Sequence, residues 1–184
     1  MSWSTPRDNH PIATVRLVEL VLFALFGTMM FCSKLLMEAL PNIHLLGMFT
    51  MTFTLVFRQK ALIPIYVYVA LCGLYAGFSA WWTIHLYVWA VLWGITMLLP
   101  RSMPHWVAAV VYPLVCALHG LCYGVLCAPV EALIYSLDFQ QTLVWIARGL
   151  PFDAIHGVGN LCVGVLILPL TALLQKLMRT VGRH

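Results

Sequence analysis

The stretch Gly149-Leu150-Pro151-Phe152-Asp153-Ala154-Ile155-His156-Gly157-Val158-Gly159-Asn160 opens a long apolar run that continues to Leu174. We expect Gly149 and Pro151 to mark the start of a helix, because proline is tolerated in a first turn, where its missing N–H is not needed. Asp153 would then lie in that first turn, where the helix dipole favours a negative charge.

A polar stripe follows along the same helix. His156 comes three residues after Asp153, and Asn160 comes four residues after His156, so the three side chains share one face. Polar groups in an apolar segment are costly unless they have partners. We favour a stripe that faces a ligand. A hydrogen-bond network between helices is the alternative that the spacing leaves open.

The composition predicts a single membrane domain over residues 1–184. Hydrophobic residues make up 62% of the chain and charged residues only 9%, whereas a soluble domain carries roughly 25% charged residues. The first apolar run is too long for the core of a signal peptide and is expected to be a retained helix. The six cysteines stand singly inside apolar runs, with no C-x-x-C, and are expected to be packing residues.

Hydrophobic runs bounded by charges, proline and glycine predict an all-α integral membrane protein, a bundle of six transmembrane helices. The expected helices cover residues 15–37, 43–57, 61–78, 84–99, 106–127 and 152–174. The loop 128–150 is expected on the outward side. Because it is half apolar, we expect a short amphipathic helix or a pair of turns over the bundle, either as a lid or as an interfacial helix.

The basic residues predict the orientation. If six spans alternate, one side collects eight basic residues: Arg7, Arg16, Arg58, Lys60, Arg101, Lys176, Arg179 and Arg183. Only Lys34 and Arg148 fall on the other side. The positive-inside rule therefore predicts a multi-pass protein of the cell membrane with both termini in the cytoplasm.

The predicted outward side also collects aromatic and polar side chains. Trp81 and Trp82 form a short loop, and His85 and Tyr87 follow in the fourth span. Two adjacent indoles can form a stacking surface for a flat ligand. An aromatic belt at the membrane interface explains them equally well.

The sequence lacks the motifs of several enzyme classes. It has no phosphate-binding loop ending in Gly-Lys-Ser/Thr, no H-E-x-x-H and no G-x-S-x-G. Asp153 and His156 stand at D-x-x-H spacing, which is the weakest of metal signals, and no second pair completes a site. The acids lie near the ends of the spans, and no inverted repeat is evident. We therefore expect a small binding protein without catalytic residues, cofactor or metal.

Four segments carry a resemblance to a known family. They are Leu40-Pro41-Asn42, the segment from Gly77-Phe78-Ser79-Ala80-Trp81-Trp82 through Tyr87-Val88-Trp89, Leu118-His119-Gly120, and residues 149–160. Together with the size and charge pattern, they make the chain resemble the substrate-binding S component of an energy-coupling factor (ECF) transporter. Such a component captures a vitamin or a related micronutrient.

The resemblance implies a pocket near the outer face, formed by outward loops and by the fourth, fifth and sixth helices. The expected substrate-binding residues are Trp81, Trp82, His85, Tyr87, His119, Tyr123, Trp145, Arg148, Asp153, His156 and Asn160. The implied partners are a transmembrane T component and two cytoplasmic ATPases, which supply the energy, and no nucleic acid. Family members commonly dock through small residues of the first helix, typically Ala. The matching positions here are Ala24, Thr28 and Cys32, all small enough for close helix contact.

Two other functions compete with this interpretation. One is an intramembrane enzyme that uses His119, His156 and Asp153 around a metal or a lipid substrate. The other is a structural or assembly factor without a ligand. The sequence does not name the cargo, but the aromatic and hydrogen-bonding side chains favour a ring-containing molecule of vitamin size. A metal ion is disfavoured as cargo, because Met1-Ser-Trp-Ser-Thr5 carries none of the histidines found at the N-terminus of some nickel and cobalt systems.

Overall fold

The computed structural model describes residues 17–40 and 42–181, and every regular element within them is a helix. Three of the basic residues used to orient the chain, Arg7, Arg16 and Arg183, lie outside these described residues, as does Pro41. The expectation of an all-α protein is confirmed for the described part.

The helices follow one another through short connections. The α-helices are α1 (Leu17–Leu36), α2 (Leu46–Phe57), α3 (Leu62–Ala76), α4 (His85–Leu98), α5 (His105–Leu121), α6 (Tyr123–Tyr135), α7 (Phe139–Gly164) and α8 (Ile167–Val181). Two short 3₁₀ helices, η1 (Arg58–Ala61) and η2 (Trp81–Ile84), precede α3 and α4.

Four helical stretches among the described residues are long and apolar enough to cross a membrane: Leu17–Leu36, Leu46–Ala76, Trp81–Leu98 and His105–Tyr135. The helices Phe139–Gly164 and Ile167–Thr180, bent by 47°, pass the same test together and add a fifth. Such lengths suit a membrane protein, because the apolar core of a bilayer needs roughly 20 residues of helix. The six-span count and the side on which the termini lie stay predictions.

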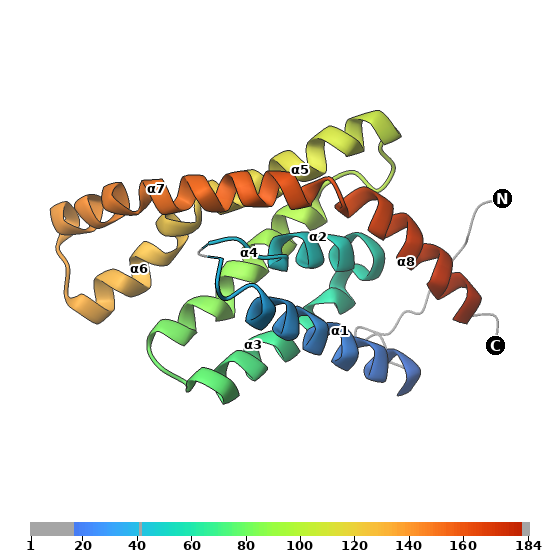
Figure 1. The fold of residues 1–184 in the computed structure, drawn as a ribbon, viewed down its shortest axis with the longest axis horizontal. Helices are drawn as coiled ribbons and strands as arrows, with labels where there is room; N and C mark the ends of the chain where they lie inside the picture. Colours follow the sequence, from blue (N-terminus) through green and yellow to red (C-terminus); the bar gives the residue numbers. More distant parts are fainter. Residues whose placement is uncertain (1–16, 41, 182–184) are drawn as a thin grey trace.

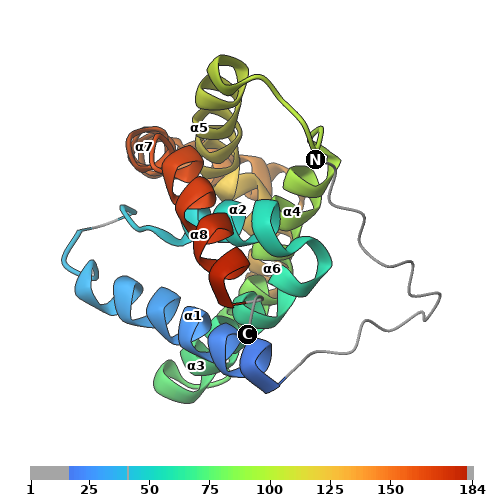
Figure 2. The same ribbon diagram turned by 90° about the vertical axis from the view of Figure 1, so that its right-hand side faces the viewer.

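The central helix of the bundle is α2. It contacts α4, α5, α7 and α8, and it lies between two flanking helix pairs (Figure 1). Eight of its twelve residues are buried, as expected for a helix that is apolar all round. On one side α1 packs along α3, and on the other α7 packs along α5 (Figure 2).

Basic side chains mark one end of the bundle. Lys60 Nζ lies 2.9 Å from Glu19 Oε2, which joins η1 to the first turn of α1. Arg58 Nη2 donates to the carbonyl oxygen of Met97 at 2.8 Å, which joins η1 to the last turn of α4. Arg101 follows in the connection to α5. We call this the basic end. Because α2 and α4 both finish here, they begin at the opposite end.

α7 begins earlier than the sequence predicts. The carboxylate of Asp138 accepts from the N–H of Gln141 at 2.8 Å, and the Gln141 side chain accepts from the N–H of Asp138 at 3.0 Å. This reciprocal capping box starts the helix at Phe139. Pro151 therefore lies inside α7, and the expectation that Gly149 and Pro151 open the helix is wrong.

An internal proline costs about 3 kcal/mol. α7 tolerates Pro151 because the helix packs along much of α5, which offsets this cost. The expected loop 128–150 is accordingly helical, except for the short turn between α6 and α7. The expected span 106–127 is divided at Cys122, where α5 ends and α6 follows. The expected span 152–174 covers the end of α7 and the beginning of α8.

Candidate functional site

Five aromatic and imidazole rings meet in the interior of the bundle. His156 of α7 lies between His44, just before α2, and Tyr123 of α6, with ring centroids 4.6 and 4.8 Å away. Trp89 of α4 lies 5.7 Å from His44 and 5.8 Å from His119 of α5. We call these five residues the ring cluster. They come from five parts of the chain, so the fold and not one local motif assembles the site.

The cluster lies in the half of the bundle away from the basic end. His44 precedes α2, and Trp89 stands in the second turn of α4, the helix that finishes at the basic end. His119 stands in the last turn of α5, which begins after Arg101. The path of each helix therefore places the cluster toward the end opposite to the basic one.

Most of the cluster is shielded from solvent. The exposed fractions of Trp89, His119 and His156 are 1%, 3% and 3%. Asn160, one turn beyond His156 on α7, is 1% exposed, and its amide is counted below with the polar groups of the cluster. Polar groups so deeply buried are normally hydrogen-bonded, since an unmade bond costs about 1–3 kcal/mol.

Two of these side chains are held by backbone carbonyls. His119 Nε2 lies 3.1 Å from the carbonyl oxygen of Val88 in α4. Asn160 Nδ2 donates to the carbonyl oxygen of Cys116 in α5 at 3.1 Å. These bonds fix the orientation of an imidazole and an amide inside the bundle.

Five buried polar atoms of this region have no hydrogen-bond partner. They are His44 Nδ1, Trp89 Nε1, His119 Nδ1, His156 Nε2 and Asn160 Oδ1. A complete hydrogen-bond network between the helices, the alternative that the spacing leaves open, would leave few such atoms. These atoms still need a partner, either ordered water or a small molecule, in addition to the bonds that the helices make to one another.

Close packing brings α7 to this region. A Cβ added at Gly120 of α5 would lie 2.8 Å from Asn160 Nδ2 and 3.0 Å from the backbone nitrogen of Gly157. The glycine is therefore required for Asn160 to reach the carbonyl oxygen of Cys116. Glycines on both helices permit the close approach that the sequence indicates.

Asp153 is buried on the same face of α7 as His156 and Asn160, as their spacing predicts. Its role as a cap differs from the expected one, because it does not lie in the first turn of its own helix. Asp153 Oδ1 accepts from the N–H of Gly124 at 3.0 Å, and Gly124 stands in the first turn of α6. Asp153 thus caps a neighbouring helix and bonds to backbone rather than to a histidine.

A second row of rings leads from the surface to the ring cluster. Trp81 is 53% exposed, and its ring centroid lies 4.7 Å from that of the buried His85. His85 lies 6.5 Å from Tyr68, and Tyr68 lies 6.1 Å from Trp89. The predicted residues Trp81 and His85 therefore connect to the cluster through Tyr68, a residue the sequence reasoning did not select.

Two other predicted residues are tied to backbone. Trp82 Nε1 donates to the carbonyl oxygen of Val69 at 2.8 Å, and Tyr87 Oη donates to that of Leu126 at 2.6 Å. Both polar groups are thereby satisfied within the bundle. Their roles are to join η2 to α3 and α4 to α6.

Trp145 and Arg148 lie away from the ring cluster. They line a hollow of about 740 Å³ on the first half of α7, together with Leu137, Gln140, Gln141, Leu143 and Val144. None of the ring-cluster residues lines this hollow. The structure therefore does not bring these two predicted residues together with the stripe on α7.

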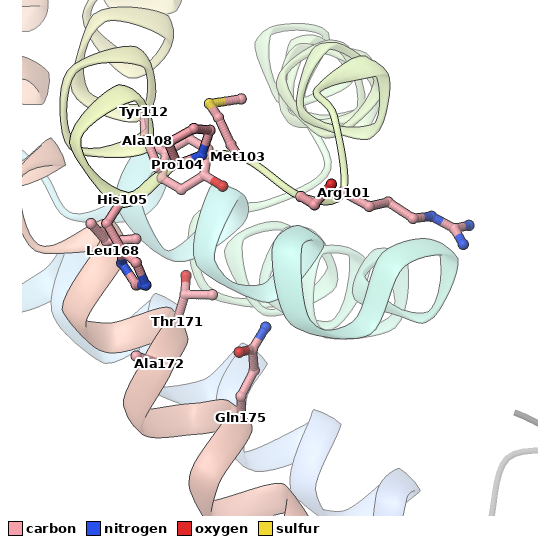
Figure 3. Close-up of a pocket in the computed structure, with 11 residues that line it drawn as sticks. Arg101, Met103, Pro104, His105, Ala108, Tyr112, Leu168, Thr171, Ala172 and Gln175 are labelled. Carbon is pink, nitrogen blue, oxygen red and sulfur yellow. The ribbon is translucent and has the colours of Figure 1, made fainter. Parts of the chain in front are cut away.

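A further cavity of about 530 Å³ lies at the basic end, between the α4–α5 connection, α5 and α8. Figure 3 shows His105 of α5 facing Thr171 and Gln175 of α8, while Arg101 extends away from them. The hydroxyl of Thr171 is buried and unpartnered. The cavity shares no residue with the ring cluster.

The expected docking residues lie on the outside of the bundle. Ala24, Thr28 and Cys32 are all exposed along one face of α1. Gly27 lies beside this face and is buried against α3, where an added Cβ would lie 2.6 Å from Val67. The small-residue face of α1 is therefore free within the described chain to contact another helix or lipid.

Sequence reasoning missed His44 and Trp89 as members of the site. Trp89 stands four residues after His85, one helical turn away, so it could have been selected with that residue. His44 carries no such signal, because its neighbours in space come from α4 and α7.

Among the described residues, no group of three or more His, Cys, Asp or Glu side chains is arranged to hold a metal ion. Comparison of the chain with family models, with curated proteins and with solved structures found no match. The function is therefore inferred from the site itself.

Proposed function

We propose that the protein is a solute-binding membrane subunit and that a small molecule binds at the ring cluster. The observation that carries this proposal is the set of five unpartnered, buried polar atoms contributed by α4, α5, α7 and the residue ahead of α2. Ligand sites are typically apolar and aromatic, with a few convergent polar groups. Polar side chains inside membrane helices are costly and usually serve a function.

The class of subunit that fits best is the S component of an ECF transporter, which imports a vitamin or related micronutrient. The chain has no nucleotide-binding loop of its own. Energy would come from a T component and two cytoplasmic ATPases. The exposed small residues Ala24, Thr28 and Cys32 are the surface proposed for the T component.

The basic end gives the proposed orientation. Arg58, Lys60 and Arg101 lie at this end, where α1 begins. The positive-inside rule makes it cytoplasmic. The six-span bundle then has both termini in the cytoplasm, and the ring cluster lies toward the outer face, where a solute arrives.

The test is to identify what the protein carries. We expect mass spectrometry of the denatured, detergent-purified protein to reveal a bound small molecule. Asn160→Leu should release little or none of it, because the change removes a polar atom from the cluster at similar volume. The matched control is Gln175→Leu at the cavity of the basic end, which should retain the molecule.

The absence of a bound molecule would contradict the proposal. If the wild-type protein releases no organic molecule, and none from a panel of water-soluble vitamins changes its melting temperature, the cluster holds only water and the proposed function is wrong. Retention of the molecule by Asn160→Leu would move the site elsewhere.

A further inference from the structure

The bonds already made inside the ring cluster determine what its free atoms can do. His119 Nε2 faces the carbonyl oxygen of Val88 at 3.1 Å. A carbonyl oxygen only accepts hydrogen bonds, so Nε2 must carry the hydrogen. In the neutral imidazole the other nitrogen, Nδ1, is then a bare lone pair. This buried, unpartnered atom is a fixed acceptor.

The same reasoning fixes Asn160. Its amide group faces the carbonyl oxygen of Cys116, so the NH₂ group must point there and donate. The amide oxygen, Oδ1, is therefore directed away from that carbonyl, and it is buried and unpartnered. Asn160 provides a second fixed acceptor.

The remaining polar atoms complete the pattern. Trp89 Nε1 can only donate, because an indole nitrogen has no free lone pair in the ring plane. His44 Nδ1 and His156 Nε2 can each donate or accept, according to the tautomer. All three are buried and unpartnered. The cluster thus offers two fixed acceptors, one fixed donor and two adaptable groups.

The cluster also lacks a permanently charged side chain to pair with an anion. The two ion pairs of the described chain, Lys34–Glu38 and Lys60–Glu19, involve none of its residues. The predicted residue Arg148 is exposed and lines the separate hollow on α7. A carboxylate or phosphate buried here would face two acceptor atoms, which repel it, and would gain a counter-charge only if a cluster histidine took up a proton.

We propose, as an extension of the proposed function and resting on it, that the cluster binds an uncharged, planar ring carrying N–H donors, of the cyclic amide class. Two N–H groups of the ring donate to His119 Nδ1 and Asn160 Oδ1, and a ring carbonyl accepts from Trp89 Nε1. The rings of the cluster, whose centroids lie 4.6–6.2 Å from one another, provide aromatic contacts around it. Any anionic part of the same molecule stays outside the cluster.

The test uses two isomeric probes that differ in their ring N–H groups and a third probe that carries a negative charge. 5,6-Dimethyluracil and 1,3-dimethyluracil are isomers, but the first keeps both ring N–H groups and the second has none. Orotate is a uracil ring with a carboxylate. Binding of each to the full-length protein in detergent, after removal of the bound molecule, is measured by calorimetry and by tryptophan fluorescence.

We expect 5,6-dimethyluracil to bind at least about tenfold more tightly than 1,3-dimethyluracil, because the second leaves two buried acceptors unpaired. Orotate should bind more weakly than 5,6-dimethyluracil. Asn160→Leu should reduce the preference between the two isomers, whereas Gln175→Leu should leave it unchanged. Melting curves establish that both variants are folded, and the comparison of probes on the wild-type protein does not depend on them.

Equal binding of the two isomers, tightest binding of orotate, or no binding of any probe would overturn this assignment of donors and acceptors. The solute-binding function is judged separately, by whether a small molecule leaves with the denatured protein. A released molecule that has no N–H donor would sustain that function and overturn the inference about its chemistry.

Discussion

The carboxylate of Asp153 reaches from the middle of α7 to the first turn of α6, where its Oδ1 accepts from the N–H of Gly124 at 3.0 Å. The first N–H groups of a helix have no partner within the helix. The dipole of α6 also stabilises a negative charge at this position. Asp153 therefore stabilises the start of a helix other than its own.

We predict that Asp153→Leu lowers the free energy of unfolding by about 1–3 kcal/mol, because it strands the buried N–H of Gly124. Asp153→Asn should cost less, since its amide oxygen can still accept that bond. Thermal melting in detergent distinguishes the two variants. Equal losses for both would show that the charge, and not the hydrogen bond, carries the effect.

The polar face of α7 could be predicted at the scale of residues, because the 3,4 spacing of Asp153, His156 and Asn160 sets a helix face. Their partners could not. Gly124 is 29 residues from Asp153 in the chain, and Cys116 is 44 residues from Asn160. Contacts at such separations come from the packing of helices, for which the local sequence carries no signal.

The start of α7 is set by a capping box and not by proline. The sequence Asp138-Phe-Gln-Gln141 has the spacing of a capping box, and in the structure both of its bonds are formed. Gly149 and Pro151, which usually end helices, lie inside α7, so a boundary predicted from them falls too late in the chain. Proline disfavours the helix interior only until tertiary packing outweighs it, as the contact between α5 and α7 does here.

The capping box gives a prediction for α7. Asp138→Ala should destabilise the protein by about 1 kcal/mol, because it removes the acceptor for the N–H of Gln141. Hydrogen exchange should accelerate in the first turns of α7 and remain unchanged near Asn160. Asp138→Asn retains the acceptor and is the matched control. Unchanged exchange in Asp138→Ala would mean that packing alone holds these turns.

At the scale of the whole molecule, composition and the lengths of the hydrophobic runs were a sufficient guide to class. An all-helical chain with several spans that can cross a membrane follows from 62% hydrophobic and 9% charged residues. The site was less accessible to prediction. The cluster includes His44 and Trp89, which local spacing did not join to His156, while Trp145 and Arg148 lie on another surface.

The bundle separates the proposed ligand site from the proposed docking surface. The ring cluster is interior, whereas Ala24, Thr28 and Cys32 are exposed on α1, which packs against α3 through its buried face. We predict that Ala24→Leu or Cys32→Trp abolishes co-purification with the T component and ATPases, because added bulk prevents close approach of helices. The isolated subunit should still carry its small molecule.

Val110→Phe is the matched control, because Val110 is also exposed but lies on α5, a different helix from the small-residue face. It adds bulk and should leave the complex intact. Loss of the bound molecule together with the complex would indicate that Ala24 and Cys32 support the fold. Loss of the complex alone, with the molecule retained, is expected, since no ring of the cluster comes from α1.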